Sequence, residues 1–221
     1  MTGGGAGEPG AGAADGDNEA VTVVLATRNR GKVPEILRLL GARATRLRLV
    51  TIDAVAPEAN LIEDGDTFEA NALAKARQAA AATGLPAIAD DSGLEVDALG
   101  GAPGVYSARY AGEPSDDARN NQKLLDALAG IPSARRRARF RCVAAYVDPA
   151  RALEIARSGS CEGEILTAPR GTLGFGYDPL FLVPRLGKSM AELPLDEKNE
   201  LSHRAAAFRA LADALPSDLR G

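Results

Sequence analysis

The amino-acid sequence predicts an α/β fold, and three observations support the prediction. Residues 21–26 (VTVVLA) form a continuous apolar run, which is typical of a strand buried on both faces of a sheet. A polar loop and an amphipathic helix follow this strand, which is the order in which α/β units are built. Residues 138–167 contain successive strand-like stretches with short breaks, the pattern of a β-meander.

The composition excludes several classes of function. The chain has 221 residues, enough for one large domain or a two-lobed one, and its formal net charge is −4. That charge argues against a general binder of nucleic acid or of membrane surfaces. No apolar run approaches the ~20 residues of a membrane helix, and the N-terminus lacks the pattern of a secretory signal. We therefore expect a cytoplasmic protein with free thiols.

The chain contains one histidine, His203. A single histidine argues against a Ser/His/Asp triad and rules out a zinc site built from several histidines. Any chemistry must therefore depend on carboxylates, lysines, arginines, hydroxyls and a hard metal ion.

The first 20 residues differ from the rest of the chain. They are rich in Gly, Ala and acidic residues and have no periodic apolar pattern. Such a segment cannot bury enough apolar surface to offset the entropy of ordering it. We predict a disordered tail over residues 1–20 and one domain over residues 21–221.

The first helix is predicted from apolar residues at i, i+3, i+4 and i+7: Val33, Ile36, Leu37 and Leu40. The loop before it, residues 27–32 (TRNRGK), places a glycine and Lys32 at the helix start. Backbone N–H groups and a cation at such a position can bind an anion. A basic loop that is merely solvated is the alternative, and this loop alone does not decide between the two.

A second strand is predicted over residues 47–52, and a second helix over residues 67–83. Asp66 is the expected N-cap, because Glu69 follows it at the spacing of a capping box, and Gly84 is the expected stop.

Three polar residues near this helix are candidates for function. Asn71 and Lys75 are four residues apart and share one helix face. For Lys75 we favour ordinary surface polarity. Glu63, just before the helix, is either a metal ligand or part of an acidic turn.

An apolar strand over residues 87–89 is expected to end in two adjacent carboxylates, Asp90 and Asp91. Such a pair beside an apolar run is costly unless the carboxylates hold a metal, a substrate or hydrogen-bond donors. Open α/β sheets also tend to place their ligand-binding sites at the carboxyl ends of strands, where these two acidic residues are expected. The alternative, with about equal weight on these residues alone, is an Asx-turn.

Four features of the second half are predicted from local patterns. Ser115 is the expected cap of a helix that ends near residues 130–132, and the arginines at 135–141 are interpreted as a solvated strand edge. Two strands are expected over residues 152–158 and 160–167. In the glycine-rich loop at 169–179, the aromatic residues either lie against a flat ligand or fill the core.

The last helix is expected to begin after Ser202, which acts as its N-cap. His203 and Arg204 then lie in the first turn, where free N–H groups favour an anion or a base carbonyl. A cation opposes the helix dipole there, so Arg204 is locally unfavourable and a functional role becomes more attractive.

Five separated motifs together resemble the inosine triphosphate pyrophosphatase family, whose members act on dITP, ITP and XTP. The motifs are TRNRGK at 27–32, EDGDTFEANALAKA at 63–76, ADDSGLEVDALGGAPGVYSARYAG at 89–112, GFGYDPLF at 174–181 and EKNELSHR at 197–204. They occur in family order, and the resemblance covers residues 21–215.

The resemblance implies an elongated α/β fold with a central mixed β-sheet, flanking helices and two lobes around a nucleotide cleft. It also implies a homodimer and Mg²⁺-dependent hydrolysis between the α- and β-phosphates, which yields a nucleoside monophosphate and pyrophosphate. The expected partner is a small-molecule nucleoside triphosphate, with no nucleic acid and no membrane.

The matched motifs imply roles for individual residues. Asp91 corresponds to the catalytic carboxylate and metal ligand, and Glu63 to a second metal ligand. Because Ile62 replaces an acid that the family often has, that second ligand is either Glu63 or Asp64. The residues implied in substrate binding are Thr27, Arg28, Asn29, Arg30, Gly31, Lys32, Ser92, Phe175, Gly176, Tyr177, Asp178, Lys198, His203 and Arg204.

Physical chemistry adds two hypotheses. Neighbouring side chains of a strand point to opposite faces, so Asp90 and Asp91 are expected to do different jobs, with Asp90 structural and Asp91 orienting the attacking water. A buried donor such as Arg204, or a backbone N–H, would pair with the 6-carbonyl of hypoxanthine or xanthine and oppose the 6-amine of adenine.

Three alternatives remain at this point. The first is a related pyrophosphatase that prefers other modified nucleotides, which the GFGYD loop and the SHR turn argue against. The second is a nucleotide-binding regulator without catalysis, which the presence of Asp91, Glu63 and Lys32 disfavours. The third is a nucleic-acid-binding protein, against which the acidic charge balance argues.

Overall fold

The computed structural model describes residues 20–28, 32–41 and 44–220. Seven strands form one mixed sheet in the order β2-β1-β3-β4-β5-β6-β7. Their bounds are Val21–Leu25 (β1), Leu47–Thr51 (β2), Ala87–Val96 (β3), Arg137–Asp148 (β4), Leu153–Ile165 (β5), Phe181–Val183 (β6) and Lys188–Ser189 (β7). The predicted tail lies almost entirely outside the described residues.

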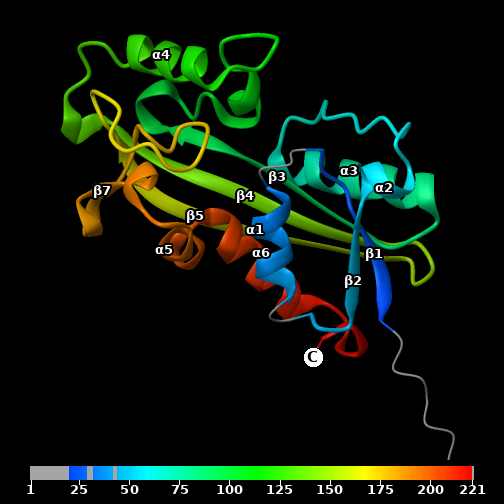
Figure 1. The fold of residues 1–221 in the computed structure, drawn as a ribbon. Helices are drawn as coiled ribbons and strands as arrows, with labels where there is room; N and C mark the ends of the chain where they lie inside the picture. Colours follow the sequence, from blue (N-terminus) through cyan, green and yellow to red (C-terminus); the bar gives the residue numbers. More distant parts are fainter. Residues whose placement is uncertain (1–19, 29–31, 42–43, 221) are drawn as a thin grey trace, which may run out of the picture.

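Helices cover both faces of the sheet (Figure 1). The α-helices are Val33–Gly41 (α1), Ile52–Val55 (α2), Phe68–Thr83 (α3), Asp117–Ala127 (α4), Leu195–Leu201 (α5) and His203–Ala214 (α6). One apolar cluster packs α1 and α6 against β1, β3 and β4, and a second packs α3 against the opposite face. A third cluster lies at the far end, around α4 and β6. The long strands β4 and β5 connect the two ends, as the elongated two-lobed fold requires.

The open edge of β3 positions the site. β1 pairs with only Ala87 and Ile88 of β3, whereas β4 pairs with β3 along its whole length. Beyond Ile88, the edge of β3 that faces β1 is therefore unpaired by that strand. Asp90, Asp91 and Ser92 lie in this stretch, where a ligand can approach the strand from its side.

The expected strand end at Asp90 and Asp91 was wrong. The strand continues through both carboxylates to Val96, so the Asx-turn alternative is wrong as well. The two side chains tolerate a strand interior because Lys32, just before α1, and side chains of α3 and α6 bind them. A local pattern does not reveal such distant partners.

Several other boundaries need correction. The cap of α3 is Thr67, whose hydroxyl accepts from Ala70 N, and the cap of α4 is Asp116, so each helix begins one residue later than predicted. The strands expected over residues 152–158 and 160–167 form one strand, β5. Gly84 does end α3, in the left-handed conformation with φ 70°, and Ser202 does cap α6.

One residue of the arginine cluster is not solvated as expected. Arg136 is buried, and its guanidinium donates to the carbonyls of Leu128, Ile131 and Leu166. A planar group with five donors can satisfy several loop carbonyls at once. Arg136 therefore ties the end of α4 to the sheet. None of the helices in the described residues is long and apolar enough to cross a bilayer.

Candidate active site

A cavity of about 430 Å³ lies at the open edge of β3. Apart from Asp64, the alternative metal ligand, every described residue to which the resemblance gives a role lines it, and Asn29, Arg30 and Gly31 lie outside the described residues. A larger, more open hollow of about 800 Å³ is lined by residues 66–70 and 101–106, but it contains none of the expected residues. We therefore take the smaller cavity, which the expected site residues line, as the candidate site.

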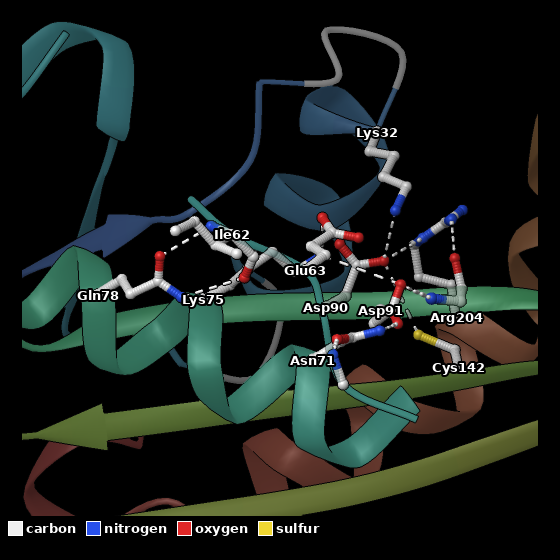
Figure 2. A network of polar contacts seen from close by, with 12 residues as sticks. Lys32, Ile62, Glu63, Asn71, Lys75, Gln78, Asp90, Asp91, Cys142 and Arg204 are labelled. Carbon is white, nitrogen blue, oxygen red and sulfur yellow. Dashed lines mark hydrogen bonds and ion pairs between the residues drawn. The ribbon is translucent and has the colours of Figure 1, made fainter. Parts of the chain in front are cut away.

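Asp90 is the most deeply buried carboxylate of the site, and it faces α1 and α6. Lys32 Nζ donates to its Oδ2 over 3.0 Å, and Arg204 Nε over 3.4 Å (Figure 2). Burial alone would raise the pKa of Asp90, but Lys32 and Arg204 outweigh burial and hold the pKa well below its ordinary value. Asp90 is thus ionised and links Lys32, which directly precedes α1, to the first turn of α6.

Arg204 is also buried, and each of its three guanidinium nitrogens donates one hydrogen bond within the protein. Its Nη1 donates to Glu35 Oε2 over 2.7 Å, and its Nη2 donates to Ser92 Oγ over 3.2 Å. These bonds fix the guanidinium plane beside the cavity. The same contacts explain how a cation is tolerated in the first turn of α6: two carboxylates, Glu35 and Asp90, offset the unfavourable dipole.

Asp91 faces the opposite side of the sheet, towards α3, as alternation along a strand requires. Asn71 Nδ2 donates to its Oδ2 over 2.9 Å, and Ser92 N donates to its Oδ1 over 2.9 Å. Burial raises the pKa of Asp91 above its ordinary value, although Lys75 and Asn71 act in the opposite direction. Asp90 and Asp91 thus face opposite sides of the sheet, as expected, and bind different partners.

Lys75 lies between two carboxylates, so surface polarity was the wrong interpretation of this residue. It is 6% exposed, and its Nζ lies 2.7 Å from Glu63 Oε1 and 4.0 Å from Asp91 Oδ1. Burial opposes its charge, yet Asp90, Glu63 and Asp91 together raise the pKa of Lys75. The segment before α3 folds back over Lys75, a tertiary contact that helical periodicity does not show.

The donor set around Lys75 suits a hard divalent cation. Carboxylate oxygens of Glu63 and Asp91 both lie near the Lys75 ammonium. Glu63 lines the cavity, whereas Asp64 does not. Among the described residues, no group of three or more His, Cys, Asp or Glu side chains is arranged to hold a metal. Mg²⁺ is commonly bound by only one or two carboxylates, with phosphate oxygens and waters completing its shell. The residues therefore fit Mg²⁺ bound together with a phosphorylated substrate.

Three described residues between β1 and α1 line the cavity: Thr27, Arg28 and Lys32. Arg28 Nη2 donates to the carbonyls of Pro57 and Ala59 over 2.6 and 2.7 Å. Arg28 therefore connects the residues just after β1 to the segment that precedes α3.

Two aromatic residues also line the cavity: Phe175, which is 41% exposed, and Tyr177, which is buried. The Tyr177 hydroxyl donates to Ser107 O, so this ring supports the loop. Lys198 Nζ lies 4.8 Å from the Phe175 ring centre and donates to Asp178 Oδ2 over 2.6 Å. Of the two interpretations of the loop aromatics, ligand contact fits Phe175 and core filling fits Tyr177.

Known proteins match this chain closely. The Ham1 family model matches residues 23–214. A dITP/XTP pyrophosphatase of Desulforamulus reducens is 51% identical over 193 residues, which cover 87% of this chain and 94% of that protein. One from Escherichia coli O157:H7 is 50% identical over 200 residues, 87% of this chain and 97% of that protein. The chain belongs to the Ham1 family.

Solved Ham1 structures share the fold. A HAM1 protein from Coxiella burnetii superposes with a TM-score of 0.80 at 42% identity, covering 88% of this chain and 98% of that one. The Staphylococcus aureus Ham1 protein gives 0.79 at 40% identity, with 87% and 97% covered. The expected family and the expected mixed, helix-flanked sheet are therefore confirmed.

In this Ham1 chain, three site-supporting residues were not singled out from the sequence. Glu35 binds Arg204, and two residues of α4 hold Gly176: Asp117 Oδ2 accepts from its N–H over 2.7 Å, and Asn121 Nδ2 donates to its carbonyl over 2.9 Å. The spacing of 117 and 121 places them on one helix face. That spacing was the only available signal, and it is common on solvated helices.

His203 also lines the cavity. It is 7% exposed and stacks on Phe140 with ring centres 4.8 Å apart. Burial lowers the pKa of His203 well below its ordinary value, and the neighbouring Arg204 and Lys198 lower it further. The imidazole is therefore neutral at physiological pH and acts here as a flat polar wall.

Proposed function

We infer that this chain hydrolyses non-canonical purine nucleoside triphosphates, dITP or ITP and XTP or dXTP, to the monophosphate and pyrophosphate. One observation supports this most directly: a single cavity is lined both by the Glu63–Lys75–Asp91 cluster and by an exposed Phe175. A triphosphate needs charge neutralisation at one end, and its base needs a flat apolar surface at the other. Removal of such nucleotides from the pool is the corresponding cellular role.

We propose that Glu63 and Asp91 hold Mg²⁺. When bound, the ion would neutralise phosphate charge and lower the pKa of a bound water. The protein's contribution is to fix the two carboxylates: Asn71 and Ser92 N hold the Asp91 side chain, and Lys75 holds Glu63. Asp91 is the proposed catalytic carboxylate, which orients the water that attacks the α-phosphate.

Lys32 is the proposed main cation at the triphosphate, with Thr27, Arg28, Asn29, Arg30, Gly31 and Ser92 as further contacts. Its Nζ lies 3.0 Å from Asp90 Oδ2, and its side chain is 15% exposed towards the cavity. An arriving phosphate competes with Asp90 for this ammonium. Asp90 keeps Arg204 as a partner during that exchange, so it is not left as an unpaired buried charge.

Phe175 is the proposed stacking surface for the base, with Gly176, Tyr177 and Asp178 shaping the loop. Lys198, His203 and Arg204 provide the polar wall. Because donors predominate on that wall, a 6-carbonyl base finds a partner and a 6-amine base does not. A buried donor left without a partner costs about 1–3 kcal/mol, which corresponds to roughly 5- to 150-fold in discrimination against adenine.

The test is pyrophosphate release from ITP, XTP, GTP and ATP with Mg²⁺, by the full chain. We expect ITP and XTP to be turned over at least about 10-fold faster than ATP, in terms of kcat/KM. Equal rates on ATP and ITP would refute the selectivity. Preference for a modified pyrimidine would favour the related pyrophosphatase, and tight nucleotide binding without release would favour the regulator.

The family resemblance supports a proposed assembly, and the charge balance and the absence of a secretory signal pattern support a proposed compartment. We propose a homodimer in the cytoplasm that has a nucleotide substrate and binds neither nucleic acid nor membranes. Size-exclusion chromatography with light scattering tests the dimer. A mass of twice 22.8 kDa supports it, and a monomer mass at micromolar concentration contradicts it.

A further inference from the structure

The segment that carries Glu63 has no regular structure of its own. Residues 60–65 belong to no helix or strand, and among the described residues no backbone–backbone hydrogen bond involves them. Yet Glu63 must stay near Asp91 if the two carboxylates share one cation. Side chains from elsewhere must therefore hold this segment in place.

Three side chains of α3 hold it in antiparallel order: Asn71, Lys75 and Gln78. Gly65 N donates to Asn71 Oδ1 over 2.8 Å, Lys75 Nζ lies 2.7 Å from Glu63 Oε1, and Gln78 binds Ile62. Spacings of four and three residues place all three on one helix face. Figure 2 shows these side chains reaching the segment from α3.

Gln78 makes the most complete of these contacts. Its Oε1 accepts from Ile62 N over 2.8 Å, and its Nε2 donates to Ile62 O over 3.1 Å. Both backbone groups of Ile62 are thus bound by one amide. The Ile62 side chain is 51% exposed, so its own packing contributes little to holding the segment.

We propose that Gln78 is a positioning residue for the metal-binding carboxylate. By binding both backbone groups of Ile62, it holds the next residue, Glu63, on the side of α3 where Lys75 contacts both Glu63 and Asp91. Gln78 does not line the cavity, so it acts through Glu63 and touches neither substrate nor metal. The proposal rests on the proposed function, because that function supplies the cation.

The test compares the full-length chain with Gln78→Ala and Gln78→Met, the latter keeping side-chain length without the amide. Gln122→Ala is the matched control, since Gln122 is an exposed helical glutamine whose amide binds Asp126 on its own helix. Three quantities are measured: Mn²⁺ affinity without nucleotide by electron paramagnetic resonance, hydrogen exchange of residues 60–65, and the Mg²⁺ dependence of pyrophosphate release.

Both Gln78 variants should weaken Mn²⁺ binding about 10-fold, because outer-shell partners of metal ligands typically have effects of this size. They should raise the half-saturating Mg²⁺ concentration about as much, keep kcat at saturating Mg²⁺ within about 2-fold, and speed exchange at residues 60–65. Gln122→Ala should change none of these.

Unchanged Mn²⁺ affinity in both variants would overturn the proposal. So would a loss of kcat at saturating Mg²⁺ with normal metal binding, or a wild-type chain that does not bind Mn²⁺. If the wild type binds Mn²⁺ but releases no pyrophosphate from any nucleotide, the proposed function fails. Mn²⁺ affinity and hydrogen exchange then still decide the role of Gln78.

Discussion

Replacing Asp90 by asparagine should destabilise the protein by removing the central anion of a buried charge network. Asp90 is 1% exposed and binds both Lys32 and Arg204. Asparagine has almost the same shape but no charge. Arg204 keeps Glu35 as a partner, whereas Lys32 loses its ion pair with Asp90.

Removing one partner of a buried ion pair costs about 3–5 kcal/mol when the other is left unpaired. Because Arg204 keeps Glu35 and the Lys32 side chain is 15% exposed, we expect the lower end, about 3 kcal/mol. In a domain of this size, that corresponds to a fall in Tm of roughly 6–12 °C.

Urea unfolding at pH 7 measures the loss. The matched control is Asp196→Asn, which removes an exposed ion pair with Arg38 and should change the free energy of unfolding by less than about 0.5 kcal/mol. A loss below about 1 kcal/mol for Asp90→Asn would refute the argument that the network is buried and coupled.

The pH dependence of this difference has a definite sign. The folded-state pKa of Asp90 lies below its unfolded value of about 3.9, so its stabilising contribution is fully present above about pH 4. The contribution is lost as pH falls through the folded-state pKa. The stability difference between wild type and Asp90→Asn should therefore be constant from about pH 5 to pH 8 and shrink only in strong acid.

Three further substitutions test the site. Asp91→Asn should abolish turnover yet leave ITP binding measurable by calorimetry, and near-wild-type turnover would contradict the catalytic role. Phe175→Ala should raise KM for ITP about 5- to 150-fold, since stacking on one base contributes roughly 1–3 kcal/mol, whereas Phe175→Tyr should keep the wild-type KM; equal KM values for Phe175→Ala and wild type would exclude stacking. Asn121→Ala should raise KM several-fold with kcat nearly constant, because it releases Gly176 beside Phe175; an unchanged KM would exclude this positioning.

Elements with strong local signals could be predicted from the sequence. The apolar run of β1, the stop at Gly84 and the cap at Ser202 follow from short-range chemistry, and the structure has all three. Alternation along a strand placed Asp90 and Asp91 on opposite faces, although the expected strand end was wrong. The local rule therefore remained valid where the boundary did not.

The partners of charged residues could not be predicted in the same way. Lys75 has the helical spacing of a surface lysine, but its environment comes from a segment that folds back over α3. Glu35 and Arg204 are 169 positions apart in the sequence and meet only because α1 and α6 pack side by side. The motif resemblance suggested which residues belong to the site, whereas only the structure shows which side chains bind and position them.

The products of ITP turnover test the central claim most directly. Phosphorus NMR of the full chain with ITP and Mg²⁺ should show pyrophosphate and inosine monophosphate appearing in equal amounts, with neither inosine diphosphate nor orthophosphate. Release of orthophosphate with inosine diphosphate would place cleavage at the γ-phosphate and contradict the account.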